Sequence, residues 1–354
     1  MRIALVSTPF VAVPPADYGG TELVIHELAE GLTAAGHEVV LFATGDSRSS
    51  ARLEWLLPRP SWPPDSLMAL NHCSWALSRI AQGSFDVVHA HSAEALALTR
   101  LVPDIPFVYT LHHERDESCS AYYPFFPDVF YTAISERQRQ LEVVLPHIRT
   151  IHHGLHAPRY AGETRAGDHV CFIGRLSQPK GPHVAIDVAE RAGVPIVVAG
   201  AIHAEDQPPG FAAREIEPRL RQPHVRYVGK IGMRRKTALL RSARALVMPL
   251  LWEEPFGLIM IEAMLCGCPV VAFPRGSAPE LIDEGLTGFL VPDADAMVDV
   301  LRNGLRGFDR EACRARAVER FGRERMVADY VSWYREATRA RAGTPSSSRL
   351  DAAA

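Results

Sequence analysis

Short apolar runs alternate with segments of helical character along almost the whole chain, and no other feature limits its possible folds as strongly. The run RIALVS reads as a buried strand. After it, Ile25, Leu28 and Leu32 share one face of a helix that ends near Gly36, and VVLFA reads as the next strand. Strands separated by helices of roughly 10–15 residues pair in parallel through right-handed crossovers. We therefore expect an α/β protein with parallel sheets.

Two alternating sets are present, and the stretch GLHAPRYAGETRAGDH, residues 154–169, separates them. Its glycine, charge and small residues are typical of a linker. With 354 residues, of which 47% are hydrophobic, the chain is long enough for two domains with separate cores. We expect two Rossmann-like domains, then an amphipathic helix and a disordered tail, over residues 1–155, 165–322, about 324–340 and 341–354.

Two local patterns predict further helices. Ser135, followed three residues later by Gln138, is a capping-box pattern and predicts a helix over SERQRQLEVVL. The basic segment MRRKTALLRSAR, residues 233–244, reads as a helix with a solvated face over an apolar stripe.

Two aromatic segments are assigned to opposite environments. Residues 49–64, which contain Trp55 and Trp62, read as an irregular surface loop, with a membrane-touching or acceptor-capping loop as the alternative. The run AYYPFFPDVFY, residues 121–131, reads as part of the core, with an acceptor pocket as the alternative.

Composition and short motifs argue against several classes of protein. The net charge of -3 and the pI near 6.6 give no bias toward nucleic acid or an anionic membrane. No apolar run approaches the roughly 18–20 residues that span a bilayer, so we expect no stable membrane insertion. The six cysteines form no CxxC pair and the first residues read as a strand, which favours a reduced, cytoplasmic protein. Cys266 and Cys268 lack two further ligands and no HExxH motif occurs, so no metal site is expected.

The segment IGRLSQPKG predicts an anion site. A strand ends at Gly174, and Arg175 and Lys180 then flank a short loop before a helix that begins near Pro182. Two cations beside a helix N-terminus suit a diphosphate. The alternative is a pair of solvated surface cations.

The segment WEEPFGLIMIEAML places two acids, Glu254 and Glu262, eight positions apart. A helix beginning at Pro255 would carry both acids on one face, about 12 Å apart along its axis. They would hold two ends of one polar ligand, such as a sugar and a ribose. The alternative is that Glu254 interacts with the helix dipole and Glu262 is a paired core acid.

The first half offers a glycine loop and several histidines. Tyr18, Gly19 and Gly20 follow the first strand but do not form GxGxxG, so a dinucleotide site is weakly indicated. Histidines lie at strand ends where ligands of parallel α/β sheets bind: His89, His91, His112 and His113. Their spacing does not match a closed metal site, and a hydrogen-bonding role is more typical of such residues than catalysis.

Taken in order, the motifs YGGTE, TLHH, IGRLSQPKG, EEPFGLIMIEAMLCGCPVV and GSAPELIDEGLTGFLV resemble those of family 4 glycosyltransferases, over roughly residues 1–340. The resemblance implies the GT-B fold, in which two Rossmann-like domains face each other across a cleft. It also implies a nucleotide-sugar donor, retention of anomeric configuration and no metal or other cofactor. The first domain would bind the acceptor, and the final helix would cross back to it.

The resemblance also assigns roles to individual residues. Arg175 and Lys180 match the diphosphate-binding pair, and Glu254 and Glu262 match the E-x7-E motif that meets the donor sugar and the ribose. His112 matches the histidine at the reacting face of the sugar, so His112 and Glu254 are the expected catalytic residues. The remaining expected contacts fall into four groups: Gly19, Gly20, Leu258 and Ile259 at the diphosphate; Phe256 and Gly257 at the sugar; Gly200, Lys230 and Ile231 at the base; and Tyr18, His91 and His113 at the acceptor.

Two departures from the family pattern stand out. Glu280 matches the acid of the GG-x-PE segment, but Ser277 replaces the usual second glycine, which leaves the contact of that loop open. The segment IHHGLH stands where many members have a PNG-type turn.

These residues suit transfer without an enzyme base. The anomeric carbon becomes oxocarbenium-like as the nucleoside diphosphate leaves, and Arg175, Lys180 and helix amides would stabilise the growing negative charge. A pair of carboxylates flanking the bond, as in glycosidases, is not evident. In similar retaining enzymes the leaving phosphate oxygen takes the acceptor's proton, so His112 is expected to orient rather than to deprotonate.

The resemblance favours a UDP- or GDP-sugar donor and a soluble small-molecule acceptor. The absence of a strongly cationic amphipathic helix from the first domain argues against a lipid-linked acceptor. A polysaccharide or glycolipid precursor is the second possibility. A phosphorylase and a non-catalytic, two-lobed nucleotide-sugar-binding protein are the alternatives from other classes.

Overall fold

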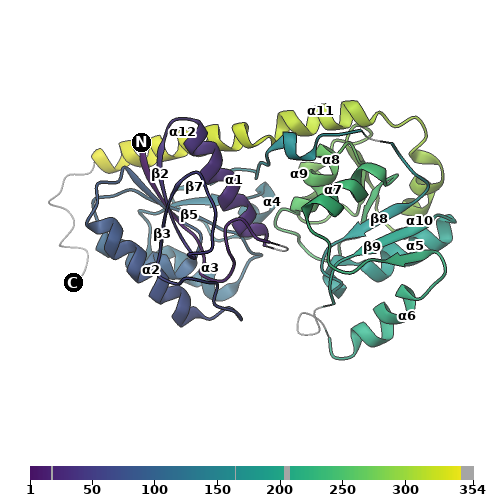
Figure 1. Cartoon of the computed structure of the whole chain (residues 1–354), viewed down its shortest axis with the longest axis horizontal. Coiled ribbons are helices and arrows are strands. Elements are labelled where there is room, and N and C mark those ends of the chain that lie inside the picture. The colour runs from purple at the N-terminus through teal and green to yellow at the C-terminus, as the bar shows by residue number, and fades with distance from the viewer. Residues whose placement is uncertain (17–18, 164, 203–207, 344–354) are drawn as a thin grey trace. The chain divides into compact units, whose positions relative to one another are not determined.

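The computed structural model describes residues 1–16, 19–163, 165–202 and 208–343, which fold as two compact units (Figure 1). The first unit holds Met1–Gly154 together with residues 323–343. The second unit holds Leu155–Gly322. Each has its own parallel sheet and its own core.

Seven strands form the described sheet of the first unit, in the order β3-β2-β1-β4-β5-β6-β7, and every neighbouring pair is parallel. The strands are β1 Arg2–Val6, β2 Glu38–Ala43, β3 Arg52–Trp55, β4 Val87–Ala90, β5 Phe107–Thr110, β6 Phe130–Ala133 and β7 Ile148–Thr150. The interior strands β4, β5 and β6 are buried at every position. Such continuous burial is typical of a parallel sheet inside an α/β unit and explains the uninterrupted apolar runs.

The described α-helices of the first unit are α1 Gly20–Ala34, α2 Ser66–Ala81, α3 Glu117–Tyr122, α4 Glu136–Leu141 and α12 Arg323–Ala342. Helix α12 comes from the end of the chain and contacts α1, β4 and β5. It buries Tyr330, Trp333 and Tyr334 against the first unit. The C-terminal helix therefore belongs to the first core.

Six strands form the described sheet of the second unit, in the order β10-β9-β8-β11-β12-β13, and their pairings are all parallel. The strands are β8 Val170–Ile173, β9 Ile196–Ala199, β10 Val225–Tyr227, β11 Leu246–Met248, β12 Val270–Ala272 and β13 Gly288–Leu290. The α-helices are α5 Pro182–Ala192, α6 Glu217–Leu220, α7 Met233–Ser242, α8 Leu258–Leu265, α9 Ala278–Leu281, α10 Ala294–Asp299 and α11 Arg310–Phe321. The prediction of parallel α/β sheets in both halves is confirmed.

Two strands were not expected from the sequence. Residues 52–55 form β3, an edge strand parallel to β2, so the prediction of an irregular loop over 49–64 is wrong there. An edge strand pairs on one side only, and the half-exposed pattern of β3 leaves no apolar run to signal it. Trp55 and Trp62 are exposed, as a surface position requires. The three-residue strand β13 is too short to give a pattern.

The boundary between the units lies at the start of the predicted linker. Leu155 forms a parallel bridge with Gly322, and residues 157–160 form a 3₁₀ turn that buries Tyr160 completely. Most of the stretch 154–169 therefore packs on the second unit instead of linking two units. At the other end, α12 continues to Ala342, beyond the expected limit of 340, and residues 344–354 of the expected tail lie outside the described residues.

Helix α4 confirms its predicted cap in part. The side chain of Ser135 accepts a hydrogen bond from the backbone N–H of Gln138 at 3.0 Å. The side chain of Gln138 instead accepts from the backbone of Ile134, at 2.8 Å. The helix ends at Leu141, earlier than predicted. In the aromatic run, Tyr123, Phe126 and Tyr131 are buried but Phe125 is exposed, so its assignment to the core is confirmed in part.

Candidate functional site

In each sheet, one pair of neighbouring strands marks a reversal of strand order. The reversal lies between β1 and β4 in the first unit and between β8 and β11 in the second. Loops at the carboxyl ends of such strands diverge and leave room for a ligand. In the second unit, these loops carry the predicted diphosphate cations and the first acid of the E-x7-E motif.

A backbone hydrogen bond joins the two loops of the second unit. The N–H of Leu251, after β11, donates to the carbonyl of Pro179, after β8, at 2.8 Å. Pro179 lies in a 3₁₀ turn, Gln178–Lys180, directly before α5. The sheet order thus brings Lys180 close to Glu254, although 74 residues separate them.

Lys180 and Glu254 form an ion pair in which both side chains are about nine-tenths buried, with exposures of 11% and 9%. The ammonium donates to Oε2 of Glu254. The indole N–H of Trp252 donates to the same oxygen at 3.1 Å. The ammonium of Lys180 also lies 4.6 Å from the centroid of the Trp252 ring, within the range of a cation–π interaction. Trp252 was not predicted as a site residue.

Glu254 does not lie on the helix that the sequence predicts for it. Helix α8 begins at Leu258, with Gly257 as its N-cap at φ +77°, so the expected placement of both acids on one helical face is wrong. This left-handed conformation favours glycine, and the turn Pro255–Gly257 separates the first acid from the helix. Phe256 is buried, while Leu258 and Ile259 are half-buried in the first turn of α8.

Glu262 lies within α8 and is almost completely buried. Its Oε1 accepts hydrogen bonds from the ammonium of Lys236 at 2.5 Å and from the hydroxyl of Tyr160 at 3.0 Å. Lys236 comes from α7, whose basic residues were expected to be solvated. Arg234 and Arg235 are exposed, but the expectation is wrong for Lys236, whose side chain is only 18% exposed.

The departure from the family pattern at Ser277 has a structural counterpart. The buried hydroxyl of Ser277 donates to the carbonyl of Phe256 at 2.6 Å, and its backbone N–H donates to the carbonyl of Glu254 at 2.9 Å. The preceding Gly276 approaches the same turn so closely that a Cβ there would lie 2.3 Å from the backbone nitrogen of Glu254. This loop therefore supports the turn that carries Glu254 and Phe256.

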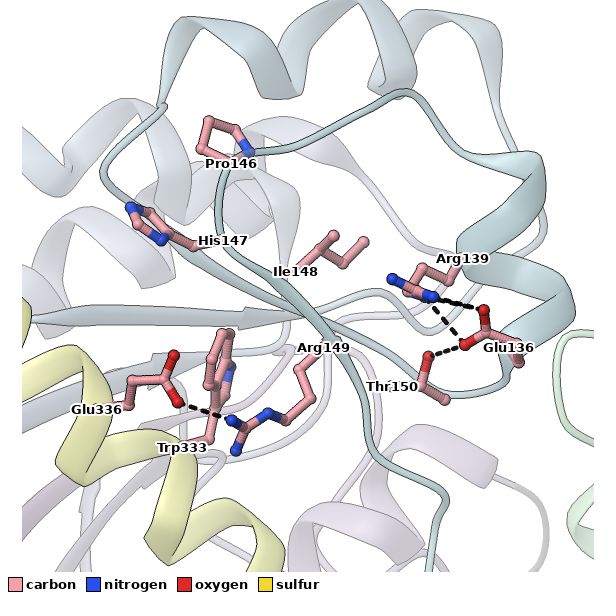
Figure 2. A pocket seen from close by; sticks show the side chains of 9 residues that line it. All are labelled: Glu136, Arg139, Pro146, His147, Ile148, Arg149, Thr150, Trp333 and Glu336. Atoms are coloured by element: carbon pink, nitrogen blue, oxygen red, sulfur yellow. Dashed lines mark hydrogen bonds and ion pairs between the residues drawn. The ribbon is translucent and has the colours of Figure 1, made fainter.

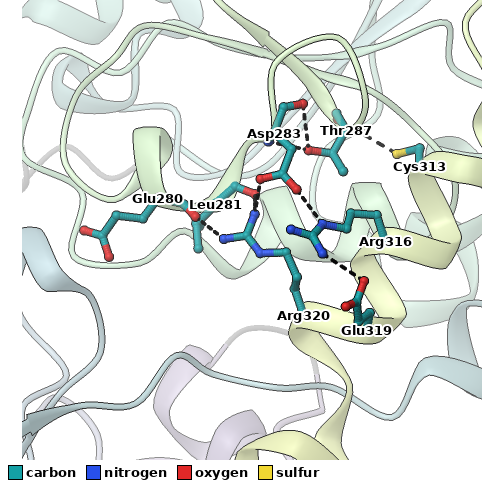
Figure 3. Close-up of polar contacts among 8 residues, drawn as sticks. All are labelled: Glu280, Leu281, Asp283, Thr287, Cys313, Arg316, Glu319 and Arg320. Carbon is teal, nitrogen blue, oxygen red and sulfur yellow. Dashed lines mark hydrogen bonds and ion pairs between the residues drawn. The ribbon is translucent and has the colours of Figure 1, made fainter.

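Arginines of helix α11 hold the far end of the same loop (Figure 3). Asp283 accepts from Arg316 Nε at 2.6 Å and from Arg320 Nη1 at 2.5 Å. Arg320 also donates to the backbone carbonyl of Glu280. Glu280 is half-buried, and Arg320 holds it through its backbone carbonyl.

The other predicted donor contacts of the second unit lie at strand ends. Arg175 follows β8 and is half-buried. The backbone of Gly200, at the end of β9, donates to the carbonyl of Gly229 at 2.9 Å, and Lys230 and Ile231 follow directly. The structure therefore brings the three predicted base-pocket residues to neighbouring strand ends. Residues 203–207, in the chain after Gly200, lie outside the described residues.

In the first unit, several histidines gather at the ends of β4, β5 and β7. His91 Nδ1 lies 2.8 Å from His112 Nε2, so one ring nitrogen donates and the other accepts. The ring of His112 stacks on His153 with 5.6 Å between centroids. His89 lies 4.2 Å from His91, ring to ring, and contacts the Tyr334 hydroxyl at 2.7 Å. His153 was not predicted as a site residue.

Burial keeps these histidines neutral. It lowers the pKa of His112 to about 3 and lowers the pKa of His89, His91 and His153 well below the ordinary value. A neutral imidazole donates through one nitrogen and accepts through the other. His112 is thus a hydrogen-bonding group near neutral pH and not a cation.

The glycine loop adjoins a buried acid. Gly19 is the N-cap of α1 and Gly20 its first residue. In the same helical turn, Glu22 accepts from the hydroxyl of Thr8 at 2.7 Å, and burial raises the pKa of Glu22. Tyr18 lies outside the described residues. The last predicted acceptor residue, His113, is exposed, and its Nδ1 lies 2.7 Å from the carbonyl of Glu114.

A separate surface pocket of the first unit, of about 400 Å³, lies beside β7 and α12 (Figure 2). Its arginines are paired: Arg149 with Glu336 at 2.7 Å, and Arg139 with Glu136 at 2.6 Å. Arg149 also lies 4.5 Å from the ring centroid of Trp333. None of the predicted site residues lines this pocket, and we assign it no role.

The described residues lack two kinds of feature. Within them, no group of three or more His, Cys, Asp or Glu side chains is arranged to hold a metal ion. No helix of the described chain combines the length and the apolar character needed to cross a bilayer.

Comparisons with known proteins cover both units. The profile of the family "Glycosyltransferase Family 4" matches residues 18–152, and that of "Glycosyl transferases group 1" matches residues 167–306. A phosphatidyl-myo-inositol mannosyltransferase of Mycobacterium leprae is 28% identical over 359 residues, covering 91% of this chain and 93% of that protein.

Two solved structures match nearly the whole chain. AviGT4, a glycosyltransferase involved in avilamycin A biosynthesis, has a TM-score of 0.73 and 26% identity, with 96% of this chain and 98% of that chain covered. Sucrose-phosphate synthase from Thermosynechococcus elongatus has a TM-score of 0.79 at 20% identity, covers 96% and 100% of the two chains, and supports the fold alone. The two parallel-sheet units are those of the GT-B fold. The chain belongs to the family 4, group 1 glycosyltransferases and is a transferase.

Proposed function

We propose that the protein transfers a sugar from a UDP- or GDP-sugar to a hydroxyl of a small molecule, with retention of anomeric configuration. The observation that best supports a nucleotide-sugar donor is the arrangement of the two motif acids, Glu254 and Glu262, in the second unit. Each acid is paired with a lysine, and the first pair lies where the loops after β8 and β11 are joined.

The proposed donor contacts follow from charge and position. Arg175 and Lys180 are the cations for the diphosphate, together with the backbone N–H groups of Leu258 and Ile259 in the first turn of α8. Glu254, Phe256 and Gly257 are proposed to meet the sugar. Glu262 is proposed to accept a hydrogen bond from a ribose hydroxyl. This is supported by the fact that Lys236 and Tyr160 both donate to the same oxygen, Oε1.

The proposed reaction needs no enzyme-borne base. The oxygen of the acceptor hydroxyl bonds to the anomeric carbon, the bond from that carbon to the diphosphate oxygen breaks, and the proton passes to a diphosphate oxygen. Arg175 and Lys180 stabilise the negative charge that forms on the leaving group, and we propose that no metal is required. His112, with its pKa lowered by burial to about 3, is suited to orient substrate and poorly suited to remove a proton.

Thermal-shift measurements with UDP, GDP and ADP and their sugars test the donor. A ligand present at 100 times its Kd should stabilise the folded protein by about 2.7 kcal/mol, which gives a clear shift in Tm. Turnover with the stabilising nucleotide sugar and a panel of acceptors then tests transfer. If none of the three nucleotides shifts the transition, the proposed donor class is wrong.

The small-molecule acceptor is supported by similarity to AviGT4, whose role is in avilamycin A biosynthesis. A lipid-linked acceptor is the second candidate, because the M. leprae relative is a phosphatidyl-myo-inositol mannosyltransferase. Exposed apolar side chains of the first unit favour it as well. Large apolar side chains are exposed within residues 55–70: Trp55, Trp62, Leu67 and Leu70.

Co-sedimentation with vesicles containing phosphatidylinositol separates the two acceptor classes. If the acceptor is a small molecule, the protein should remain in the supernatant. If the acceptor is lipid-linked, the protein should sediment with the vesicles, and Trp62→Ser should reduce the sedimented fraction. Radiolabelled sugar recovered in the lipid fraction would favour the second candidate directly. Recovery in the aqueous fraction with a defined small acceptor would favour the first.

We also propose a cytoplasmic location. All six cysteines of the chain fall within the described residues and are free thiols, and all except Cys119 are buried. Free thiols are typical of a reducing compartment.

A further inference from the structure

The two hydrogen bonds to Glu254 reach the same oxygen. The ammonium of Lys180 and the indole N–H of Trp252 both donate to Oε2. Among the residues that the structure describes, Oε1 of Glu254 has no hydrogen-bond partner.

Glu262 repeats this arrangement with different residues. The ammonium of Lys236 and the hydroxyl of Tyr160 both donate to Oε1. Oε2 of Glu262 has no partner within the described part of the chain. In each motif acid, one carboxylate oxygen therefore accepts hydrogen bonds from a lysine ammonium and from the N–H or O–H of an aromatic side chain. The second oxygen accepts neither of these bonds.

A lysine alone would not define which oxygen stays available. The terminal torsion of a glutamate is broad, and an ammonium is a compact charge whose three donors rotate. An indole N–H or a phenol O–H belongs to a rigid ring with only two side-chain torsions before it. Tyr160 is completely buried, and the half-buried Trp252 has the Lys180 ammonium 4.6 Å from the centroid of its ring, so each rigid ring has a packing partner of its own.

We propose that Trp252 and Tyr160 are positioning residues that orient the two acids for the donor. Trp252 keeps Oε1 of Glu254 directed to a hydroxyl of the transferred sugar. Tyr160 keeps Oε2 of Glu262 directed to a ribose hydroxyl. This inference rests on the proposed function, because it assumes a nucleoside-diphosphate-sugar donor.

Tyr160→Phe tests the ribose half, because it removes one hydroxyl and keeps the buried ring. The affinity of wild type and variant is measured for the nucleoside diphosphate that wild type binds and for its 2′,3′-dideoxy analogue. The variant should bind the ribonucleotide about tenfold more weakly, in line with one lost hydrogen bond to a charged group. It should bind the dideoxy analogue as well as wild type does. Equal losses for both ligands, or no loss for either, would overturn the ribose role.

Trp252→Phe tests the sugar half, because phenylalanine keeps a ring face for Lys180 but has no N–H. The affinity for the nucleoside diphosphate alone should be unchanged, while kcat/KM for the nucleotide sugar falls about tenfold. Trp252→Ala also removes the ring face and should weaken binding of the diphosphate. A loss of diphosphate affinity in Trp252→Phe, or an unchanged kcat/KM, contradicts the assignment.

The two proposals fail in different ways. If wild type binds no nucleoside diphosphate, the proposed function is wrong and the positioning roles fall with it. If wild type binds and transfers normally but the variants show no dependence on ribose hydroxyls or on the sugar, only the positioning roles are wrong. Far-ultraviolet circular dichroism and the Tm of each variant identify a loss that comes from unfolding. Tyr160→His restores a ring N–H donor, so recovery of the ribonucleotide affinity in this variant is the deciding measurement.

Discussion

The ammonium of Lys180 and the carboxylate of Glu254 are paired, although the sequence assigns the first to a diphosphate and the second to a sugar. Both side chains are about nine-tenths buried, so neither charge is fully solvated by water. Removing one member of such a pair leaves the other buried without compensation. A variant at either position therefore changes stability as well as substrate binding, and the two effects must be measured separately.

Lys180→Ala should reduce kcat/KM by at least about 100-fold, because a charge partner of the leaving diphosphate is lost. It should also lower the free energy of unfolding by about 3–5 kcal/mol, since Glu254 is left unpaired. Steady-state kinetics and denaturant unfolding measure the two effects.

Adding Glu254→Gln to Lys180→Ala should recover most of the stability and none of the activity. Arg306→Ala, which removes an exposed cation of the same unit, is the matched control and should behave as wild type. Near-normal turnover by Lys180→Ala would show that this lysine does not bind the diphosphate.

Lys236→Met should weaken binding of the nucleoside diphosphate, because Glu262 loses its charged partner and keeps only the Tyr160 hydroxyl. Calorimetric titration measures the change in Kd, expected to be at least tenfold. Arg235→Met, one position away on α7 but exposed, should leave the Kd unchanged. Equal effects of the two variants would mean that only the net charge of the helix matters.

The buried histidines predict a dependence of stability on pH. Their pKa values in the folded protein are lowered, so below about pH 6.5 the unfolded chain binds protons that the folded chain does not. The stability of the first unit is complete above that pH and should fall by about 1.4 kcal/mol per pH unit for each such histidine as the pH decreases toward 4. His89→Gln should reduce this slope. His113→Gln, at an exposed position, should keep it, and a Tm independent of pH between 7 and 5 would contradict the burial of these rings.

Ser277→Ala removes the hydroxyl that donates to the carbonyl of Phe256. Because both groups are buried, the free energy of unfolding should fall by about 1–3 kcal/mol. KM for the nucleotide sugar should rise more than kcat falls, since the turn that carries Glu254 and Phe256 is less well supported. Ser277→Thr, which keeps the hydroxyl, provides the comparison, and an unchanged Tm in Ser277→Ala would show that the hydrogen bond contributes nothing.

Removal of divalent metal should leave activity unchanged, because Arg175 and Lys180 are proposed to neutralise the leaving diphosphate. Initial rates after dialysis against EDTA, and again after addition of Mg²⁺ or Mn²⁺, measure this. A loss that either ion restores would contradict the metal-independent mechanism.

Much of the fold could be predicted because local physics determines it. Continuous apolar runs mark strands that are buried on both sides, so β1 and β2 were evident in RIALVS and VVLFA, and Ser135 shows where α4 begins. Elements with weak local signals were missed. The edge strand β3 is half-exposed and β13 has three residues, and neither produces a pattern that can be distinguished from a loop.

The sequence by itself determined the parallel α/β architecture and the residue types of the site, because periodicity and motif order are local properties. Only the tertiary structure decided which residues hold the two acids. Glu254 lies outside α8, before the turn that ends at Gly257. Glu262 is paired with Lys236 and Tyr160, which lie 26 and 102 residues away in the chain. Such partners follow from the order of strands in the sheet and from the need to compensate a buried charge. The spacing of a motif predicts neither the strand order nor the partner of a buried charge.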